Sequence, residues 1–311
     1  MIWLPPTIFS IGPVTIRLYG LVYALSFLAG YVYLKSAAKR GTIPGLREEQ
    51  VETLLLWLIT AMIIGSRTVF FGIYRPDLIT ADPLRFPLTF LALWEGGMSF
   101  HGALAGMIIA ALIFCKKHHV SFLSLADAAA LPAALALFFG RIANFANGEL
   151  VGTLTSVPWC IDWSTNPYLT NPPGGCRHPS QLYEAGKNLL IFGILAFLSR
   201  RQARSAQPRR SRKTSHKASY TAPSKLRVNT SYVKTSYKEG FIFWNFILLY
   251  GLLRFLVNFF RDDPRWLGIS TGQALSLLMV LIAAVALIRG KPWKTPAIPK
   301  KSRKTEQKPS P

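Results

Sequence analysis

The chain has 311 residues, of which 50% are hydrophobic and only 16% are charged, and its formal net charge is +22. Soluble domains usually carry about 25% charged residues. The deficit here falls in long apolar runs, which argues against a large soluble protein with unusually apolar core helices. These runs predict an all-α polytopic membrane protein.

Seven apolar segments are long enough to cross a bilayer, since about 20 residues of helix span its hydrocarbon core. Three of them contain no charged residue, and four contain an arginine or end at one. In chain order, the predicted spans are Leu18–Leu34, Thr53–Tyr74, Gly96–Cys115, Ala128–Asn147, Asn188–Ser199, Phe241–Phe260 and Trp266–Ile288. The first residues lack the basic region and cleavage site of a signal peptide, so we expect them to be retained.

Lysine and arginine gather in alternate loops. Residues 200–238 contain twelve of them and no acidic residue, and residues 289–311 contain eight against one glutamate. Because basic loops stay in the cytoplasm, seven spans place the amino terminus outside and the carboxyl terminus in the cytoplasm. We expect a multi-pass membrane protein.

The chain divides into a membrane domain and a tail. The predicted regions are a transmembrane catalytic domain (1–289) containing an extracytoplasmic head or lid (151–178) and a basic disordered cytoplasmic loop (202–238), then a basic cytoplasmic tail (290–311). The loop suits either anionic lipid or RNA, and its few aromatic residues favour lipid. Cys160 and Cys176 in the head can pair outside the cytoplasm, but two cysteines in one loop leave this open.

Three arginines lie inside predicted spans, where charge is costly and marks a functional site. Counted from the cytoplasmic ends of their spans, Arg67, Arg141 and Arg254 lie about 21–22 Å up. His101 lies about 7–8 Å below the outer face, and Tyr19 lies somewhat higher. We therefore expect these side chains to meet around a shared anion in the outer half of the membrane. Guanidinium groups pair with phosphate, so a phospholipid headgroup fits. The alternative is that each arginine snorkels or pairs with carbonyls.

Helical spacing adds polar neighbours to two of these arginines. Arg141 and Asn144 share a face, and the sixth span carries a polar row. That row consists of Tyr250, Arg254, Asn258 and Arg261. Glu149 and Glu184 are the plausible outer-side carboxylates, and Ser180 is a possible helix cap.

His101 is either a helix-packing residue or a base. No metal-binding or nucleotide-binding motif occurs, so we expect no metal and no cofactor. Two other classes stay open. An anion transporter can also hold arginines at mid-depth, although no internal repeat is evident. A membrane insertase can combine an arginine with a basic ribosome-binding tail. We expect no nucleic acid among the partners of this protein.

Five blocks together resemble a known family. They are RLYGL (17–21), WEGGMSFHG (94–102), GRIANFANGEL (140–150), RHPSQLYE (177–184) and YGLLRFLVNFFR (250–261). In this order they are similar to the motifs of bacterial phosphatidylglycerol–prolipoprotein diacylglyceryl transferases. The similarity runs from about Phe9 to Ile288 and excludes the basic loop and tail.

The resemblance implies transfer of a diacylglyceryl group from phosphatidylglycerol to the lipobox cysteine of a prolipoprotein signal peptide, with release of glycerol 1-phosphate. It also implies a multi-pass protein of a bacterial inner membrane, with Arg141 and Arg254 as essential residues. From the chemistry of the reaction, we expect these two arginines to hold the phosphate. The other matching positions are Tyr19, His101, Asn144, Glu149, Gly152, Tyr250 and Arg261. We expect His101 to be the base, with Tyr19 or the field of the arginines as rivals. The chain departs from the family at Ala103, Ala143 and Asn258, and the last of these replaces a common glutamate.

Overall fold

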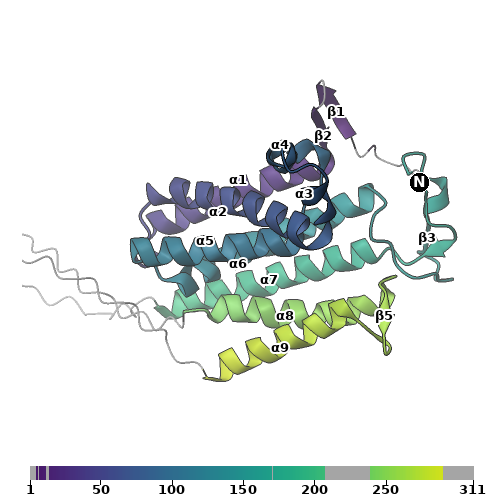
Figure 1. Ribbon diagram of the computed structural model, residues 1–311. Coiled ribbons are helices and arrows are strands. Elements are labelled where there is room, and N and C mark those ends of the chain that lie inside the picture. The colour runs from purple at the N-terminus through teal and green to yellow at the C-terminus, as the bar shows by residue number, and fades with distance from the viewer. Residues whose placement is uncertain (1–4, 6, 12–13, 170, 207–238, 290–311) are drawn as a thin grey trace, which may run out of the picture.

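The computed structural model describes residues 5, 7–11, 14–169, 171–206 and 239–289, and its helices lie side by side in a bundle (Figure 1). Within this described part of the chain, seven helices are long and apolar enough to cross a membrane, which agrees with the predicted number of spans. They are α1 (Leu18–Lys39), α2 (Gln50–Val69) with the π-helical turn η1 (Phe70–Tyr74), α5 (Phe100–His118), α6 (Phe122–Ala146), α7 (Ser180–Ala206), α8 (Phe241–Val257) with the 3₁₀ turn η4 (Asn258–Phe260), and α9 (Thr271–Arg289).

Two spans begin later than the apolar runs indicated. The third helix begins only at Phe100, because Gly96 and Gly97 have positive φ and the Ser99 side chain accepts the first free amide, that of Gly102, at 3.3 Å. The last begins at Thr271, after the antiparallel pair β5 (Arg265–Trp266) and β6 (Ile269–Ser270). The residues of this hairpin from Trp266 onward carry no charge, as in the helix that follows up to Ile288, so hydropathy alone did not separate the hairpin from the span.

Helix α7 is longer than predicted at both ends. It begins eight residues before Asn188, and protein rather than lipid buries the polar residues of this first part. It continues to Ala206, so the first residues of the predicted disordered segment 202–238 are helical. Glutamine, alanine and arginine favour helix, which explains the extension. The rest of that segment, 207–238, and the tail 290–311 lie outside the described residues.

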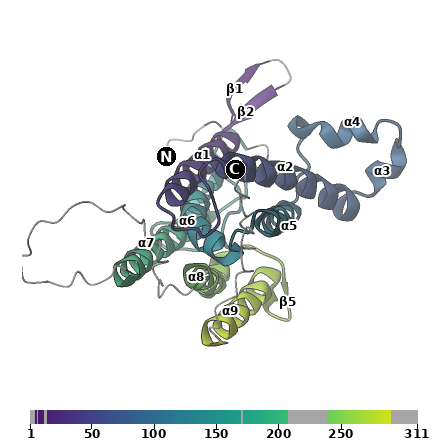
Figure 2. The same ribbon diagram turned by 90° about the vertical axis from the view of Figure 1, so that its left-hand side faces the viewer.

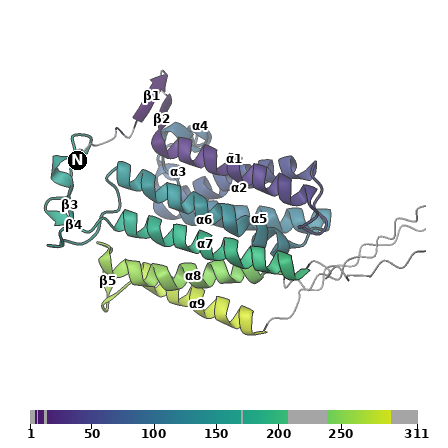
Figure 3. The same cartoon turned by 180° about the vertical axis from the view of Figure 1, so that it is seen from behind.

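The short elements gather around the bundle. Before α1, β1 (Thr7–Ile11) pairs with β2 (Val14–Arg17). Between α2 and α5 lie α3 (Asp77–Ala81), α4 (Phe86–Leu91) and the 3₁₀ turn η2 (Leu93–Glu95). Between α6 and α7, the segment 151–178 contains β3 (Ile161–Asp162), the 3₁₀ turn η3 (Trp163–Thr165) and β4 (Cys176–Arg177). This head lies at one end of the bundle, beyond the adjoining ends of α6 and α7 (Figures 1 and 3).

Figure 2 shows the helices from one end of the bundle, where α2 packs chiefly against α5, and where α6, α7 and α8 pack against one another. α2 and α5 approach at Gly65 and Gly102, where a Cβ on either would collide with the carbonyl of the other. A second apolar core joins α6, α7 and α8 through Ala134, Ile191 and Leu195, which are fully buried. This core sets the helices that carry Arg141, Glu184 and Arg254 against one another.

Hydrogen bonds at one end of the bundle, and a disulfide and an aromatic contact at the other, hold these helices and the head in place. At the end away from the head, Asp127 of α6 accepts the Gly240 and Phe243 amides at 2.8 and 2.7 Å and so caps α8. In the head, Cys160 and Cys176 form a disulfide, which resolves the pairing that the sequence left open. Trp163 is fully buried and packs edge-on against Phe145 of α6.

Candidate functional site

Three cations from three helices surround one buried carboxylate, that of Glu184. Arg254 of α8 donates to Oε1 through Nη1, and Lys187 donates to Oε2 at 2.7 Å. The Nε of Arg141 on α6 lies 3.8 Å from the same Oε2. The Glu184 side chain is 0% exposed, whereas those of both arginines are 16% exposed. We call these four residues the Glu184 cluster. The structure thus brings Arg141 and Arg254 together, as their depths predicted, but around a carboxylate of the protein itself.

Tyr250 closes one side of the cluster. Its ring lies on α8, one turn before Arg254, and the Lys187 ammonium sits 3.9 Å from the ring centroid. A cation over the face of a tyrosine ring is attracted by the negative charge of that face. Tyr250 and Arg254 thus both face α7, as their spacing predicted.

A second network joins Arg141 to Glu149. Arg141 Nη1 donates to Asn144 Oδ1 at 3.2 Å, and Asn144 Nδ2 donates to Glu149 Oε2 at 3.3 Å. The Tyr19 hydroxyl of α1 lies within electrostatic reach of both the Glu149 carboxylate and Arg141. Four predicted site residues therefore meet here. We call Arg141, Asn144, Glu149 and Tyr19 the Glu149 network.

The start of α7 ties this network to the head. Gln181 Nε2 donates to the Glu149 carbonyl at 2.6 Å, and the Ser180 hydroxyl donates to the Leu150 carbonyl at 2.9 Å. Ser180 was suggested as the helix cap, but the helix already begins at Ser180, and the Leu182 and Tyr183 amides donate to the Pro179 carbonyl at 2.9 and 3.3 Å. The RHPSQLYE block thus binds the loop that ends GRIANFANGEL, while its last residue, Glu184, enters the cluster.

Gly152 brings the head against the end of α8. Its backbone bridges to Arg261, and its amide donates to the His178 carbonyl at 3.0 Å. A Cβ here would meet the Phe260 carbonyl and, at 2.7 Å, the His178 Cβ. Only glycine allows so close an approach.

Arg261 has one N–H group that no described residue accepts. Its Nε and Nη2 each donate to Asp263 at 2.9 Å, whereas Nη1 is buried without a partner among the described residues. Burial raises the pKa of the Asp263 carboxyl, but the hydrogen bonds and charge of Arg261 prevail and hold that pKa below its usual range. The pair therefore stays ionised at neutral pH, within electrostatic reach of Glu184.

Arg67 does not join these residues. Its side chain is buried and donates only to backbone carbonyls, in the manner of the alternative that the sequence left open. The acceptors are Phe90 at 2.8 Å, Ala92 at 3.0 Å, Gly97 at 3.1 Å, Thr89 and Gly96. The prediction that Arg67 shares an anion with Arg141 and Arg254 was wrong. Depth along a helix does not set the direction in which a side chain points, and here the connection from α4 to α5 supplies the acceptors.

Two other predicted positions lie apart from the Glu184 cluster. His101 is exposed, stacks edge-on against the neighbouring Phe100 ring, and hydrogen-bonds to no described residue. Asn258 is fully buried and donates to Ser270 at 3.1 Å, at the start of α9. The α-helix changes to a 3₁₀ turn at this residue, so the predicted polar row on the sixth span is interrupted there.

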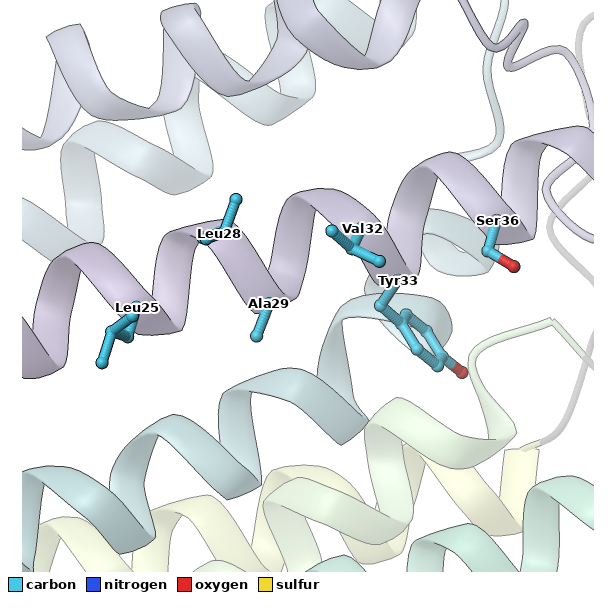
Figure 4. A pocket seen from close by; sticks show the side chains of 6 residues that line it. All are labelled: Leu25, Leu28, Ala29, Val32, Tyr33 and Ser36. Carbon is cyan, nitrogen blue, oxygen red and sulfur yellow. The ribbon is translucent and has the colours of Figure 1, made fainter.

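Apolar hollows occur on the outer surface of the bundle. One, of about 540 Å³, runs along α1, where Figure 4 shows its lining side chains from Leu25 to Ser36. Another, of about 720 Å³, lies between α2 and α5 around Gly65 and Gly106. Neither is lined by a charged side chain, so neither is a candidate for binding an anion. Within the described residues, no group of three or more His, Cys, Asp or Glu is arranged to hold a metal ion.

The chain matches known proteins over nearly its whole length. A family model described as prolipoprotein diacylglyceryl transferase matches residues 6–222 and 225–289. The chain belongs to this family. The resemblance seen in the five sequence blocks is thereby confirmed.

Curated relatives carry the name phosphatidylglycerol–prolipoprotein diacylglyceryl transferase. The one from Rhodospirillum rubrum is 35% identical over 303 residues, which cover 94% of this chain and 95% of the relative. The one from Geobacter sulfurreducens is 35% identical over 285 residues, covering 89% and 92%. The one from Rickettsia rickettsii is 32% identical over 293 residues, covering 92% and 97%.

Sequence reasoning missed Lys187 altogether and treated Glu184 only as a possible partner. Lys187 follows Glu184 at a spacing of three, which on a helix places the two side chains together. A lysine inside an apolar span was therefore the available signal. It was overlooked because the predicted span began at Asn188, the residue that follows Lys187, so the lysine fell just outside that span.

Proposed function

We propose that the protein transfers the diacylglyceryl group of phosphatidylglycerol to the cysteine thiol of a prolipoprotein lipobox, in a bacterial inner membrane. Membership of the family and the names of the relatives support the reaction class. The observation that carries the proposal to particular residues is the meeting of Arg141 and Arg254 around Glu184, close to the head.

The two arginines suit a phosphate group. Both guanidinium groups are partly exposed while the carboxylate between them is buried, so their remaining N–H groups are free to face a ligand. Guanidinium donors match phosphate oxygens in pairs. The carboxylate holds the two planar groups in place before the lipid arrives, which reduces the entropy lost on binding.

The reaction develops negative charge where the arginines are. The thiol sulfur attacks the glyceryl carbon that carries the phosphate oxygen, a C–S bond forms, and the C–O bond breaks. The electron pair of that bond stays on the phosphate, which leaves as glycerol 1-phosphate, and the thiol proton passes to a base. The phosphate charge thus grows from one toward two, and fixed cations in a site with little water stabilise that change.

Two side chains compete for the proton. Tyr19 lies in the Glu149 network beside Arg141, whereas His101 lies exposed at the start of α5. Either needs the thiol to approach it, and the arginines assist by stabilising a thiolate. We expect His101→Ala to leave a partial rate if the field of the arginines suffices, and Tyr19→Phe distinguishes the rival base.

The test is transfer to a peptide by the purified full-length protein. Mass spectrometry follows addition of a diacylglyceryl group to the cysteine of a lipobox peptide in vesicles that contain phosphatidylglycerol. We expect Arg141→Ala and Arg254→Ala each to lower the rate by about a hundredfold or more, the effect of losing a donor that stabilises developing charge.

Arg85→Ala is the control, because Arg85 is an exposed arginine whose partner is the exposed Asp82. It should transfer at the normal rate. Normal turnover by Arg141→Ala would refute the phosphate-binding role, and absence of transfer by the unaltered protein would refute the activity itself.

A further inference from the structure

Lys187 is a buried cation that the proposed chemistry does not use. Its side chain is 2% exposed, and its ammonium contacts the Glu184 carboxylate and the Tyr250 ring. A lysine buried in a membrane-spanning helix without a partner is unfavourable. Glu184 offsets that cost, but Arg141 and Arg254 already contact the same carboxylate. The lysine therefore adds a charge that its partner does not cancel.

The charged side chains of the Glu184 cluster, the Glu149 network and the Arg261–Asp263 pair together leave a surplus of one positive charge. The cations are Arg141, Lys187, Arg254 and Arg261. The carboxylates are Glu149, Glu184 and Asp263, each joined to one of those cations directly or through Asn144. The three carboxylates balance three of the cations. Without Lys187, the site would be neutral.

We propose that Lys187 is the specificity-determining cation of the site, whose charge makes it select a lipid phosphodiester that carries a single net negative charge. This inference rests on the proposed function. Phosphatidylglycerol has one phosphate charge and a neutral glycerol headgroup, so it balances the surplus. A zwitterionic lipid brings an ammonium group into a site that is already positive, and like charges at close range are unfavourable.

The role follows from position rather than from contact with the reacting atoms. Lys187 and Arg141 approach the same oxygen of Glu184, while Arg254 takes the other. With Lys187 present, the single charge of Glu184 is shared among three cations, so the two guanidinium groups keep more of their positive charge for the phosphate. Without it, the carboxylate would cancel half of the charge that the two arginines present.

Substitutions that step the net charge test this inference. The variants are Glu184→Gln, with one charge more than the natural site, Lys187→Met, with one less, and the double variant Lys187→Met/Glu184→Gln, with the natural surplus. The purified full-length protein is assayed for transfer in micelles, with KM for phosphatidylglycerol, kcat, and Ki for glycerol 1-phosphate and for inorganic phosphate.

Anion affinity should follow the charge. Lys187→Met should raise both KM for the lipid and Ki for glycerol 1-phosphate about tenfold, since one unit charge at this range contributes at least that much. Its kcat should stay within about threefold, because the group does not touch the reacting atoms. Glu184→Gln should lower Ki, and the double variant should return it near the natural value. Lys187→Arg, which keeps the charge, should behave like the unaltered protein.

Lys35 offers a matched control. It also pairs with a glutamate, Glu52, at 3.0 Å and lies over a tyrosine ring, that of Tyr31, but it sits near the far end of α1 and is partly exposed. Lys35→Met should leave KM and Ki unchanged. If Lys187 has only a structural role, Glu184→Gln and the double variant should bind glycerol 1-phosphate no better than Lys187→Met does.

Each other outcome overturns the inference. A Lys187→Met variant with unchanged Ki, or one that loses only kcat, shows that the lysine does not select the anion. A change in Ki without a change in KM restricts the lysine to the free phosphate product. If Lys187→Met fails to fold, the comparison of Glu184→Gln with the double variant still decides. Failure of the proposed function looks different, because the unaltered protein would then transfer nothing.

Discussion

Glu184 is a single carboxylate that holds three helices together and orders two arginines. It is fully buried. Its two oxygens accept hydrogen bonds from Lys187 of α7 and Arg254 of α8, and Arg141 of α6 lies close to one of them. Without it, the buried lysine and the two partly buried arginines would repel one another in a medium of low polarity. One residue thus makes a dense positive site stable before any lipid is bound.

Arg67 shows how another buried arginine can be purely structural. Its N–H groups donate to carbonyls between Thr89 and Gly97, so it fastens the connection from α4 to α5 onto α2. Arg67→Met removes all of these donors and leaves buried carbonyls without partners. We expect a loss of stability on the order of 3 kcal/mol, measured as a lower melting temperature in detergent.

The same variant separates the two kinds of arginine. Because Arg67 does not meet Arg141 or Arg254, Arg67→Met should leave Ki for glycerol 1-phosphate unchanged, whereas Arg141→Ala should raise it. Arg67→Lys should recover only part of the stability, since one ammonium cannot reach acceptors spread over this stretch of chain. A weaker Ki in Arg67→Met would return Arg67 to the anion site.

At the scale of elements, the start of α7 joins architecture to chemistry. Ser180 and Gln181 hold the loop after α6, and one turn later Glu184 reaches the arginines. The first turns of α7 therefore contact the loop that leads into the head and also carry Glu184 of the cluster. This explains why a polar block of the sequence is built into the first turns of a membrane helix.

The disulfide between Cys160 and Cys176 stabilises that head. It closes a loop with a sequence separation of 16, for which loop entropy contributes on the order of 3 kcal/mol. We expect Cys160→Ala/Cys176→Ala to speed protease cleavage within residues 153–175 while the membrane helices keep their melting temperature. Limited proteolysis followed by mass spectrometry measures this.

Cys115→Ala is the matched control, because Cys115 is a free cysteine buried on α5. It should leave cleavage of the head unchanged. Equal cleavage in the double variant and the unaltered protein would show that the other head contacts, such as Trp163 against Phe145, suffice without the bond.

The elements themselves were largely predictable, because a bilayer allows few solutions. A chain in hydrocarbon must satisfy every backbone group internally, so a long apolar run becomes a helix. The ends were less predictable. Composition does not distinguish the hairpin at Trp266 from the helix after it, and it does not reveal that protein buries the polar start of α7.

Across the whole molecule, the site was only partly predictable. The depths of Arg141 and Arg254 along their helices were enough to predict that these two side chains meet, because α6 and α8 both pack on α7. Depth failed for Arg67, since α2 packs chiefly on α5 and its arginine points to a local turn. The direction of a side chain depends on which helices are neighbours, and one sequence read for hydropathy does not contain that information.

Orientation in the membrane is the remaining property of the whole molecule. The head and the Glu184 cluster lie toward one end of the bundle, while α7 ends, α8 begins and α9 ends at the other (Figures 1 and 3). In the sequence, the basic segment 200–238 leads from the end of α7 to the start of α8, and the basic segment 289–311 begins at the end of α9. The positive-inside rule therefore predicts that the head and the lipid site face outward.

Reporter fusions test this arrangement. Green fluorescent protein joined after Pro311 should fluoresce and alkaline phosphatase at the same place should be inactive, because the carboxyl terminus is predicted to be cytoplasmic. Alkaline phosphatase inserted after Gly174, in the exposed part of the head, should be active. The opposite pattern would put the arginines near the cytoplasmic face, where an exported prolipoprotein would not meet them, and would exclude the proposed reaction in its present form.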